Sequence, residues 1–145
     1  MRLRLISLLV VIAAAVPAVA LASHHASALK FEAYMAGKSE AGTPGAAKGK
    51  GTAKITITGT KVCWKFTGIK GTDKVTASHI HAGKAGKSGN VVVAFFAGPL
   101  KMTGCVASTS ATVKAIAKNP AAFYVNIHTV KYPAGAIRGQ LHAGD

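Results

Sequence analysis

The sequence predicts an all-β fold in which short antiparallel strands form a sandwich or a barrel. Segments with an apolar residue at every second position recur along the chain, which is typical of strands with one face on a core and one toward water. Turns containing glycine or proline separate these segments. About 120 residues remain once an N-terminal leader is set aside, which is enough for one domain with a real core.

The leader, residues 1–22, is predicted to be a secretory signal peptide. Arg2 and Arg4 give a positive start, an apolar run follows at 5–16, and small residues suited to cleavage lie at 18–22. The run is short for a membrane span, which needs about 20 residues, so an uncleaved anchor is the weaker alternative. We expect a secreted or periplasmic protein with no integral membrane segment after signal removal. The predicted parts are the signal peptide at 1–22, an N-terminal tail at 23–29 and a β-sandwich domain at 30–145.

The first half of the domain is predicted to contain a strand, a long loop and a hairpin. Apolar and polar residues alternate over 31–35, which predicts the first strand. Residues 37–51 are rich in Gly, Ala and Lys and have little to bury, so we expect a long exposed loop. Residues 53–57 and 62–66 alternate on either side of a Gly-Thr turn, which predicts a hairpin with Cys63 on the face away from the core.

The second half is predicted to add short strands and the one helix. Residues 75–81 and 91–96 are expected to be strands joined by a glycine-rich loop, and 104–106 a short strand at most. Residues 110–118 are predicted to be helical, because Ser or Thr can cap the start and an Asn-Pro pair follows the end. With two final strands, the total of seven or eight short strands indicates an immunoglobulin-like antiparallel β-sandwich.

The two final strands, 123–129 and 137–141, are predicted to form a hairpin. Their apolar faces meet one core only in registers that preserve the alternation of side chains. A five-residue loop over 131–135, a common hairpin length, satisfies this condition. The cation of Arg138 would then face His128 and favour its neutral form. The predicted pairs are His128 with Arg138, Asn126 with Gln140, and Tyr124 with His142.

Polar side chains of this hairpin are expected to share the face away from the core. They are Tyr124, Asn126, His128, Arg138, Gln140 and His142. His79 and His81, two residues apart on an earlier strand, point to one side of it as well. Histidines on strands are the constellation in this chain that could carry chemistry. The alternative is a hydrogen-bonded polar face that fixes the strand register.

The chain is strongly basic, with a formal net charge of +14. Loss of Arg2 and Arg4 with the signal would leave 16 basic against four acidic residues, and Arg138 as the only arginine. Nucleic-acid readers favour arginine and interleave aromatic residues with the charge. Here single lysines are spread through the domain, so no nucleic-acid partner is expected. The basic surface keeps the protein soluble, or it attracts an anionic envelope polymer or another exported protein.

Cys63 and Cys105 are predicted to form a structural disulfide. Two cysteines in an exported chain usually pair, and no Cys-x-x-Cys spacing indicates a redox or metal site. The bond would close a loop of about 43 residues, for which loop entropy gives roughly 4 kcal/mol of stability. A metal thiolate pair or a redox pair is the weaker alternative.

Several blocks of sequence occur in the order found in a known family. They are Phe31-Glu32-Ala33, His79-Ile80-His81-Ala82-Gly83, Gly89-Asn90-Val91-Val92-Val93, Tyr124-Val125-Asn126-Ile127-His128-Thr129, Tyr132-Pro133 and Gly135-Ala136-Ile137-Arg138-Gly139-Gln140-Leu141. The chain thus resembles the chordin-type (CHRD) domain of small exported bacterial proteins, although the family usually carries an acidic residue where Ala136 stands. The resemblance implies an immunoglobulin-like β-sandwich and no established biochemical activity. The growth-factor antagonism of chordin does not transfer to this small lysine-rich chain.

His79, His81 and His128 form a three-nitrogen set suited to copper or zinc, with His142 as a further candidate ligand. Copper–zinc superoxide dismutases are also sandwiches with a His-x-His pair on a strand. Their zinc-site cluster of histidines and an aspartate after that pair is absent here, because residues 82–90 contain neither. A dismutase is therefore improbable, and a metal-binding module is the better alternative.

A second metal motif depends on the cleavage site of the signal. Cleavage after Ala22 would expose Ser23-His24-His25, whose amine and third-position histidine offer a square plane of nitrogens to Cu(II) or Ni(II). Cleavage after Ala20 would destroy this arrangement.

Classical hydrolase chemistry has little support in the sequence. The four acidic residues, Glu32, Glu40, Asp73 and Asp145, are scattered, whereas a glycosidase needs two facing carboxyl groups. No Gly-x-Ser-x-Gly elbow is present, and the glycine-rich loop lacks the spacing of a phosphate cradle. The leading hypothesis is an exported, non-catalytic binding or structural module of the cell envelope. A copper- or zinc-binding protein is the second, and a copper-dependent redox enzyme the third.

Overall fold

The structure is a computed structural model that describes residues 27–145. The predicted signal peptide at 1–22 and the Ser23-His24-His25 motif lie outside the described residues. None of the helices in the described part is long and apolar enough to cross a membrane.

One antiparallel sheet of nine strands forms the domain, so the all-β sandwich is confirmed. The elements are β1 (Leu29–Ala36), η1 (Gly37–Ser39), β2 (Lys50–Thr58), β3 (Lys61–Lys70), β4 (Val75–Ala82), β5 (Val91–Ala97), β6 (Thr103–Ala107), α1 (Ser110–Lys118), η2 (Pro120–Ala122), β7 (Phe123–Thr129), β8 (Ile137–Gln140) and β9 (His142–Ala143). The strand count exceeds the predicted seven or eight because β9 is a two-residue strand that pairs with β1.

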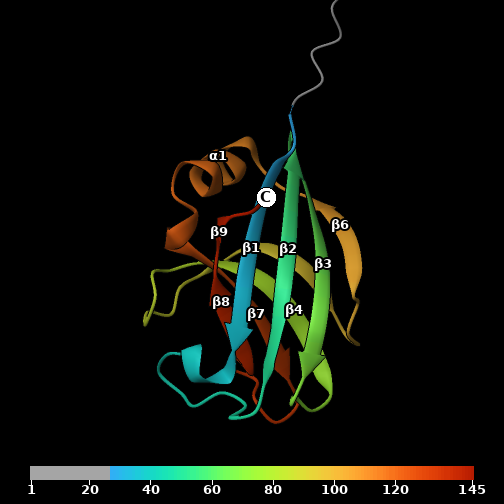
Figure 1. The fold of residues 1–145 in the computed structure, drawn as a ribbon, viewed down its shortest axis with the longest axis vertical. Helices are drawn as coiled ribbons and strands as arrows, with labels where there is room; N and C mark the ends of the chain where they lie inside the picture. Colours follow the sequence, from blue (N-terminus) through green and yellow to red (C-terminus); the bar gives the residue numbers. More distant parts are fainter. Residues whose placement is uncertain (1–26) are drawn as a thin grey trace, which may run out of the picture.

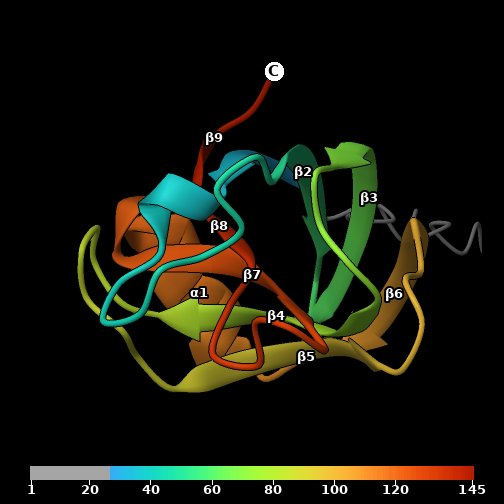
Figure 2. The same ribbon diagram turned by 90° about the horizontal axis from the view of Figure 1, so that it is seen from below.

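The sheet folds over itself into two layers. Its strand order is β5-β4-β7-β8-β1-β2-β3-β6, and Figures 1 and 2 show β1, β2 and β3 facing the layer of β4, β5 and β7. The end strands β5 and β6 contact each other, so the sheet nearly closes into a barrel. The two layers therefore have separate outer faces, one on β1–β3 and one on β4, β7 and β8.

The core lies between the layers and consists of the alternate apolar residues that the sequence predicts. Phe31, Ala33 and Met35 of β1 are buried, as are Ala53, Ile55 and Ile57 of β2. Trp64 of β3 stacks on Phe95 with ring centroids 4.8 Å apart, and its indole nitrogen donates to the Lys101 carbonyl at 3.0 Å. Burial of such side chains, each worth about 1.5–3 kcal/mol, drives the two layers together.

The predicted helix and disulfide are both confirmed. Helix α1 spans Ser110–Lys118, and the Thr109 side chain caps it by accepting a hydrogen bond from the Thr112 amide at 3.1 Å. Cys63 and Cys105 are bonded and lie directly opposite each other on β3 and β6. The bond ties the edge strand β6 to the body of the sheet.

The long loop at 37–51 is not exposed throughout, so that prediction was wrong. It begins with η1, and Gly37, Ala46 and Gly49 are buried. The Ala46 amide donates to the Ala136 carbonyl at 2.8 Å, which fastens the loop to the start of β8. Small residues allow this close approach, because a side chain at Gly37 would collide with the Ala46 carbonyl.

The predicted register of the last hairpin was also wrong, by two residues. Tyr124 lies opposite Gln140, and Asn126 lies opposite Arg138. The connection between β7 and β8 is longer than five residues, because Thr129 and Tyr132 form their own turn within it. The Ala136 amide then donates to the Ile127 carbonyl at 2.8 Å and starts the ladder. A shift of two keeps every side chain on its predicted face.

The polar face of this hairpin does not point to water as expected. Tyr124, Asn126 and Arg138 are each only 2% exposed. Two loops cover them, residues 37–49 and residues 83–90, and we call the second the covering loop. Polar side chains of the outer face of β4, β7 and β8 thus form a polar layer beneath these loops, in which His79 and His128 are half-buried.

Candidate metal centre

Three of the histidines singled out in the sequence meet in the buried polar layer. His79 and His81 lie on β4 and His128 on β7, where Asn126 and Ala77 are the direct partners of His79 and His128. Ring centroids are 5.0 Å apart for His79 and His128, and 5.7 Å apart for His81 and His128. One nitrogen from each ring lies within 4.8 Å of the other two. We call these residues the three-histidine cluster.

Backbone carbonyls fix the tautomers of two of the rings. His81 Nδ1 is 3.0 Å from the Gly89 carbonyl of the covering loop, and His128 Nδ1 is 3.0 Å from the Pro133 carbonyl. Because a carbonyl oxygen only accepts, the hydrogen of each neutral ring is on Nδ1. The Nε2 atoms of both rings therefore carry a free lone pair.

The nitrogen atoms left over are buried and unpartnered. His79 Nδ1, His81 Nε2 and His128 Nε2 have no hydrogen-bond partner among the described residues. A buried polar atom without a partner costs about 1–3 kcal/mol, and native proteins usually satisfy such atoms. Three such atoms lie in one cluster, and two of the rings hydrogen-bond a carbonyl through their other nitrogen. Histidines that bind a metal ion have this arrangement.

The protein environment keeps all three rings neutral. Burial is the main cause that lowers the pKa of His79 to about 4, and charges on His128 and His81 add to the effect. Burial likewise lowers the pKa of His81 and of His128. The expected influence of Arg138 falls on His81, because the hairpin register differs from the predicted one. A neutral imidazole is the form that binds a metal ion.

A stack of aromatic and cationic groups holds His81 in place. The Tyr124 ring lies 4.9 Å from the His81 ring with an interplanar angle of 6°, and the Arg138 guanidinium lies 3.9 Å from the Tyr124 centroid. Arg138 donates to the carbonyls of Lys87 and Lys84 at 3.0 and 3.3 Å. The stack therefore fastens the covering loop over the cluster.

Gln140 and Tyr124 add further bonds to this loop. Gln140 Nε2 donates to the carbonyls of Gly83, Ala121 and Phe123. The Tyr124 hydroxyl accepts from the Gly89 amide at 3.2 Å. The predicted polar face of the last hairpin thus supports the histidines, with the exception of His142.

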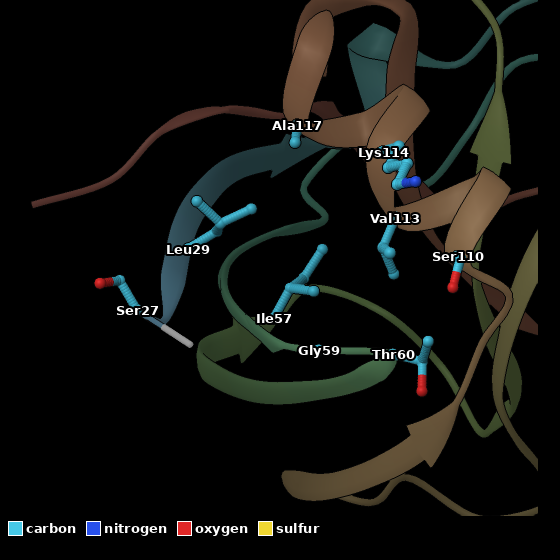
Figure 3. Close-up of a pocket in the computed structure, with 9 residues that line it drawn as sticks. All are labelled: Ser27, Leu29, Ile57, Gly59, Thr60, Ser110, Val113, Lys114 and Ala117. Carbon is cyan, nitrogen blue, oxygen red and sulfur yellow. The ribbon is translucent and has the colours of Figure 1, made fainter. Parts of the chain in front are cut away.

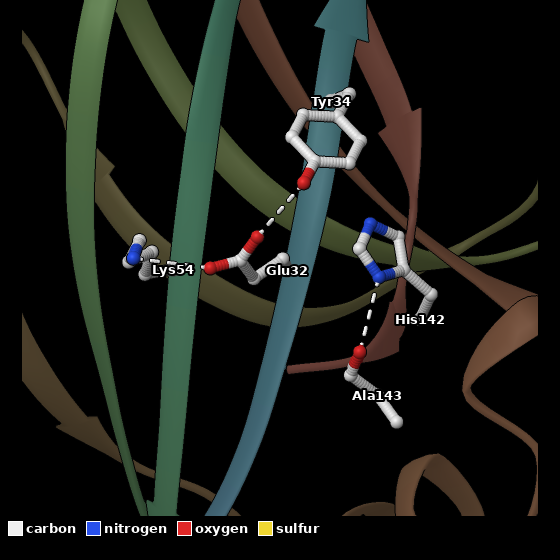
Figure 4. A network of polar contacts seen from close by, with 5 residues as sticks. All are labelled: Glu32, Tyr34, Lys54, His142 and Ala143. Carbon is white, nitrogen blue, oxygen red and sulfur yellow. Dashed lines mark hydrogen bonds and ion pairs between the residues drawn. The ribbon is translucent and has the colours of Figure 1, made fainter. Parts of the chain in front are cut away.

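His142 is not brought to the cluster. It lies on β9 at the outer face of β1–β3, where its ring stacks on Tyr34 at 5.0 Å. Figure 4 shows this exposed network, in which the Tyr34 hydroxyl donates to Glu32 at 3.1 Å and Lys54 pairs with Glu32 at 3.1 Å. The exposed carboxylate of Glu32 has a pKa below its usual value, first because of Lys54 and then because of Tyr34.

Glu40 is a member of the polar layer that sequence reasoning missed. Its Oε2 lies 3.5 Å from Asn126 Nδ2, whereas Glu40 Oε1 and Asn126 Oδ1 are buried without partners. Burial raises the pKa of Glu40 to about 7, against the opposing effects of Arg138 and of the Asn126 hydrogen bond. No sequence signal marks this contact, since the two residues are 86 positions apart.

An apolar groove lies elsewhere in the molecule. It is a groove of about 380 Å³ between α1 and the ends of β1 and β2. Figure 3 shows Leu29, Ile57 and Val113 pointing into it, with Lys114 at its side. Its lining holds no histidine, cysteine or carboxylate.

The family comparison covers the whole polar layer. A family model described as CHRD domain matches residues 31–141. Comparisons with curated proteins and with solved structures gave no significant match. The three histidines, Tyr124, Asn126, Arg138 and Gln140 all fall within the matched segment.

Proposed function

The chain belongs to the CHRD-domain family, and from this premise we propose that its domain binds one copper or zinc ion through His79, His81 and His128. The observation that carries the proposal is the set of three buried, unpartnered nitrogen atoms on neutral rings. A purely structural polar face would use these atoms in hydrogen bonds, as it does with the Nδ1 atoms of His81 and His128.

The spacing of the nitrogens suits a single ion after a small adjustment. Metal–nitrogen bonds of about 2.0–2.1 Å place three ligands in a plane at about 3.5 Å from one another. The ligand atoms here lie within 4.8 Å of one another. A side-chain shift of about 1 Å, within the reach of a rotamer adjustment, would bring them to bonding distance.

A calorimetric titration of the purified protein with Cu(II) and Zn(II) tests the proposal. The protein carries His24→Ala and His25→Ala, which removes the N-terminal histidines as competing ligands. We expect one equivalent of metal per chain, lost in His79→Ala and in His128→Ala. His142→Ala is the matched control, a histidine on the other outer face, and it keeps full binding.

The tryptophan in the core reports whether the variants remain folded. Near-ultraviolet circular dichroism of Trp64 should be unchanged in His79→Ala, because that ring makes no hydrogen bond through Nδ1. Metal binding that survives in both cluster variants would refute the site.

The predicted signal peptide supports a role outside the cytoplasm, where copper and zinc are captured or held. The buried ligand atoms favour holding an ion over presenting it to a substrate. A copper-dependent redox enzyme is accordingly the least supported of the three hypotheses.

Binding of an anionic envelope polymer remains a second candidate, supported by the outer face of β1–β3. Exposed lysines follow this face, where the carboxylates of Glu32 and Asp145 also lie. These lysines are Lys30, Lys54, Lys61 and Lys65. Binding of this kind would weaken as salt is raised and would not respond to His79→Ala. Sedimentation of the protein with an acidic polysaccharide at low and high salt measures it.

A further inference from the structure

We infer that the ion held by the three-histidine cluster is monovalent, so that the cluster selects Cu(I) over Cu(II) and Zn(II). This inference rests on the proposed function and names the ion that the site takes. It follows from the charge, the number and the burial of the ligand atoms.

The cluster offers no negative charge to the ion. All three ligands are neutral imidazoles, and none of the acidic side chains of residues 27–145 joins them. Glu32 pairs with Lys54 on the other layer, and Asp73 accepts from the Lys131 amide. Glu40 makes its hydrogen bond in the polar layer with Asn126, and its charge also interacts with that of Arg138, beside which it lines a pocket.

A buried site that cannot compensate the charge of an ion favours the ion with the smaller charge. The cost of moving an ion out of water grows with the square of its charge, so a divalent ion costs about four times as much as a monovalent ion of equal size. Zinc and Cu(II) sites usually offset this cost with a carboxylate, a thiolate or a bound hydroxide. The described residues place none of the first two at the cluster.

A fixed positive charge adds to this preference. Arg138 is 2% exposed and stacks on the Tyr124 ring, which in turn stacks on His81. Its two side-chain hydrogen bonds go to backbone carbonyls, which do not neutralise it. Glu40 offsets its charge only in part, because burial raises the pKa of Glu40 to about 7. Repulsion from this guanidinium scales with the charge of the ion, so it is about twice as strong for a divalent ion as for a monovalent one.

The number of ligands points in the same direction. Zinc in three-histidine sites takes a fourth ligand from solvent. The three nitrogens here are buried from solvent beneath the covering loop and the β7–β8 connection. Cu(I) is a closed-shell ion that two or three nitrogen ligands satisfy, and imidazole is among the ligands suited to copper.

The experiment compares three ions on the protein carrying His24→Ala and His25→Ala. Cu(I), kept reduced by ascorbate under nitrogen so that the disulfide stays intact, is titrated against a chromophoric Cu(I) chelator. Zn(II) and Cu(II) are titrated against chelators of their own. We expect one equivalent of Cu(I), bound at least tenfold more tightly than Zn(II) and Cu(II), a difference of about 1.4 kcal/mol or more.

A charge variant provides the second test. Asn126→Asp places a carboxylate on the same face, directly opposite His79, and should reduce the ratio of Cu(I) to Zn(II) affinity by at least tenfold (about 1.4 kcal/mol). Thr58→Asp, an exposed position on β2, is the matched control and leaves the ratio unchanged.

The possible results separate this inference from the proposed function. One equivalent of Zn(II) or Cu(II) bound more tightly than Cu(I), and lost in His79→Ala, overturns the inference and leaves the metal site standing. No binding of any of the three ions refutes both. Tight Cu(I) binding that persists in His79→Ala and His128→Ala also refutes both, because the ion is then held elsewhere.

Discussion

The two outer faces of the sandwich each carry a tyrosine stacked on a histidine, in very different settings. On β4 and β7 the rings of Tyr124 and His81 are 4.9 Å apart, and both side chains are buried. On β1 and β9 the rings of Tyr34 and His142 are 5.0 Å apart, and Tyr34 is 66% exposed. The same pair of residue types is a surface contact in one place and part of a candidate metal centre in the other.

The difference is the covering loop and the connections that fasten it. Arg138, Gln140, Tyr124 and His81 all bond backbone atoms of residues 83–89. This cover removes Tyr124, Asn126 and Arg138 from water and leaves His79 and His128 half-buried. The outer face of β1–β3 has no such cover, and its charges remain solvated. Burial lowers the pKa of His79, His81 and His128 and favours their neutral form.

Removal of the Arg138 side chain should have the largest effect on stability, because this side chain holds the covering loop against the outer face of β4, β7 and β8. Arg138→Ala leaves two carbonyls and the Tyr124 ring without their partner, so we expect a loss of about 3 kcal/mol in the free energy of unfolding. Urea denaturation followed by Trp64 fluorescence measures it. Lys54→Ala on the open face is the control and should leave the midpoint nearly unchanged; equal effects of the two variants would contradict the contrast between the faces.

Metal should stabilise the covered face alone. At a free metal concentration 100 times the dissociation constant, the free energy of unfolding should rise by about 2.7 kcal/mol. The rise should vanish in His79→Ala and persist in His142→Ala. Thermal melts with and without metal show it, and stabilisation that depends on His142 would place the site on the wrong face.

Acid should weaken the folded protein through the buried histidines. The pKa of His79 is about 4 in the folded chain and near 6.5 when unfolded, so the unfolded state binds more protons between these values. Stability gained above pH 6.5 is therefore lost as the pH falls toward 4. Because His79 is partly solvated, we expect a loss of about 2 kcal/mol at most.

Protonation of Glu40 opposes this loss of stability in acid, so the full loss is seen only when Glu40 is replaced. Its folded pKa of about 7 exceeds its ordinary value of 4.5, so its protonation favours the folded state and its contribution to stability falls as the pH rises from 4.5 to 7. Glu40→Gln should therefore show a steeper loss between pH 7 and pH 4.5 than the unsubstituted protein in urea melts. A shallower loss in this variant would contradict the assignment.

A smaller gain is expected when an unpartnered ring is replaced. His79→Leu removes a buried nitrogen without a partner, so without metal it should raise the free energy of unfolding by about 1 kcal/mol. His142→Leu on the open face should have no comparable effect. Strong destabilisation by His79→Leu in the absence of metal would mean that this histidine has a structural role.

Alternation in the sequence predicted the strands and the inward side chains, and the signals at its two ends predicted the helix. Sequence alone sufficed for these features because each of them depends on residues that are neighbours in the chain. The alternation of side chains in the hairpin assigned Asn126 and Arg138 to one face, but alternation cannot distinguish registers that differ by two residues. The turn formed by Thr129 and Tyr132 decided between them.

The cover over the site could not be predicted in this way. Arg138 reaches Lys87 across 51 positions, and Glu40 reaches Asn126 across 86. Such contacts depend on how loops return over a finished sheet. The three histidines were nevertheless identifiable, because two share a strand at a spacing of two residues and the third follows the same alternation.

The most direct test is a crystal structure of the protein prepared with copper under reducing conditions, with data collected at the copper absorption edge. We predict a single anomalous peak in the polar layer, about 2.0–2.1 Å from His79 Nδ1, His81 Nε2 and His128 Nε2. A peak beside His142, or a polar layer without one while copper is present in the crystal, would contradict the three-histidine site.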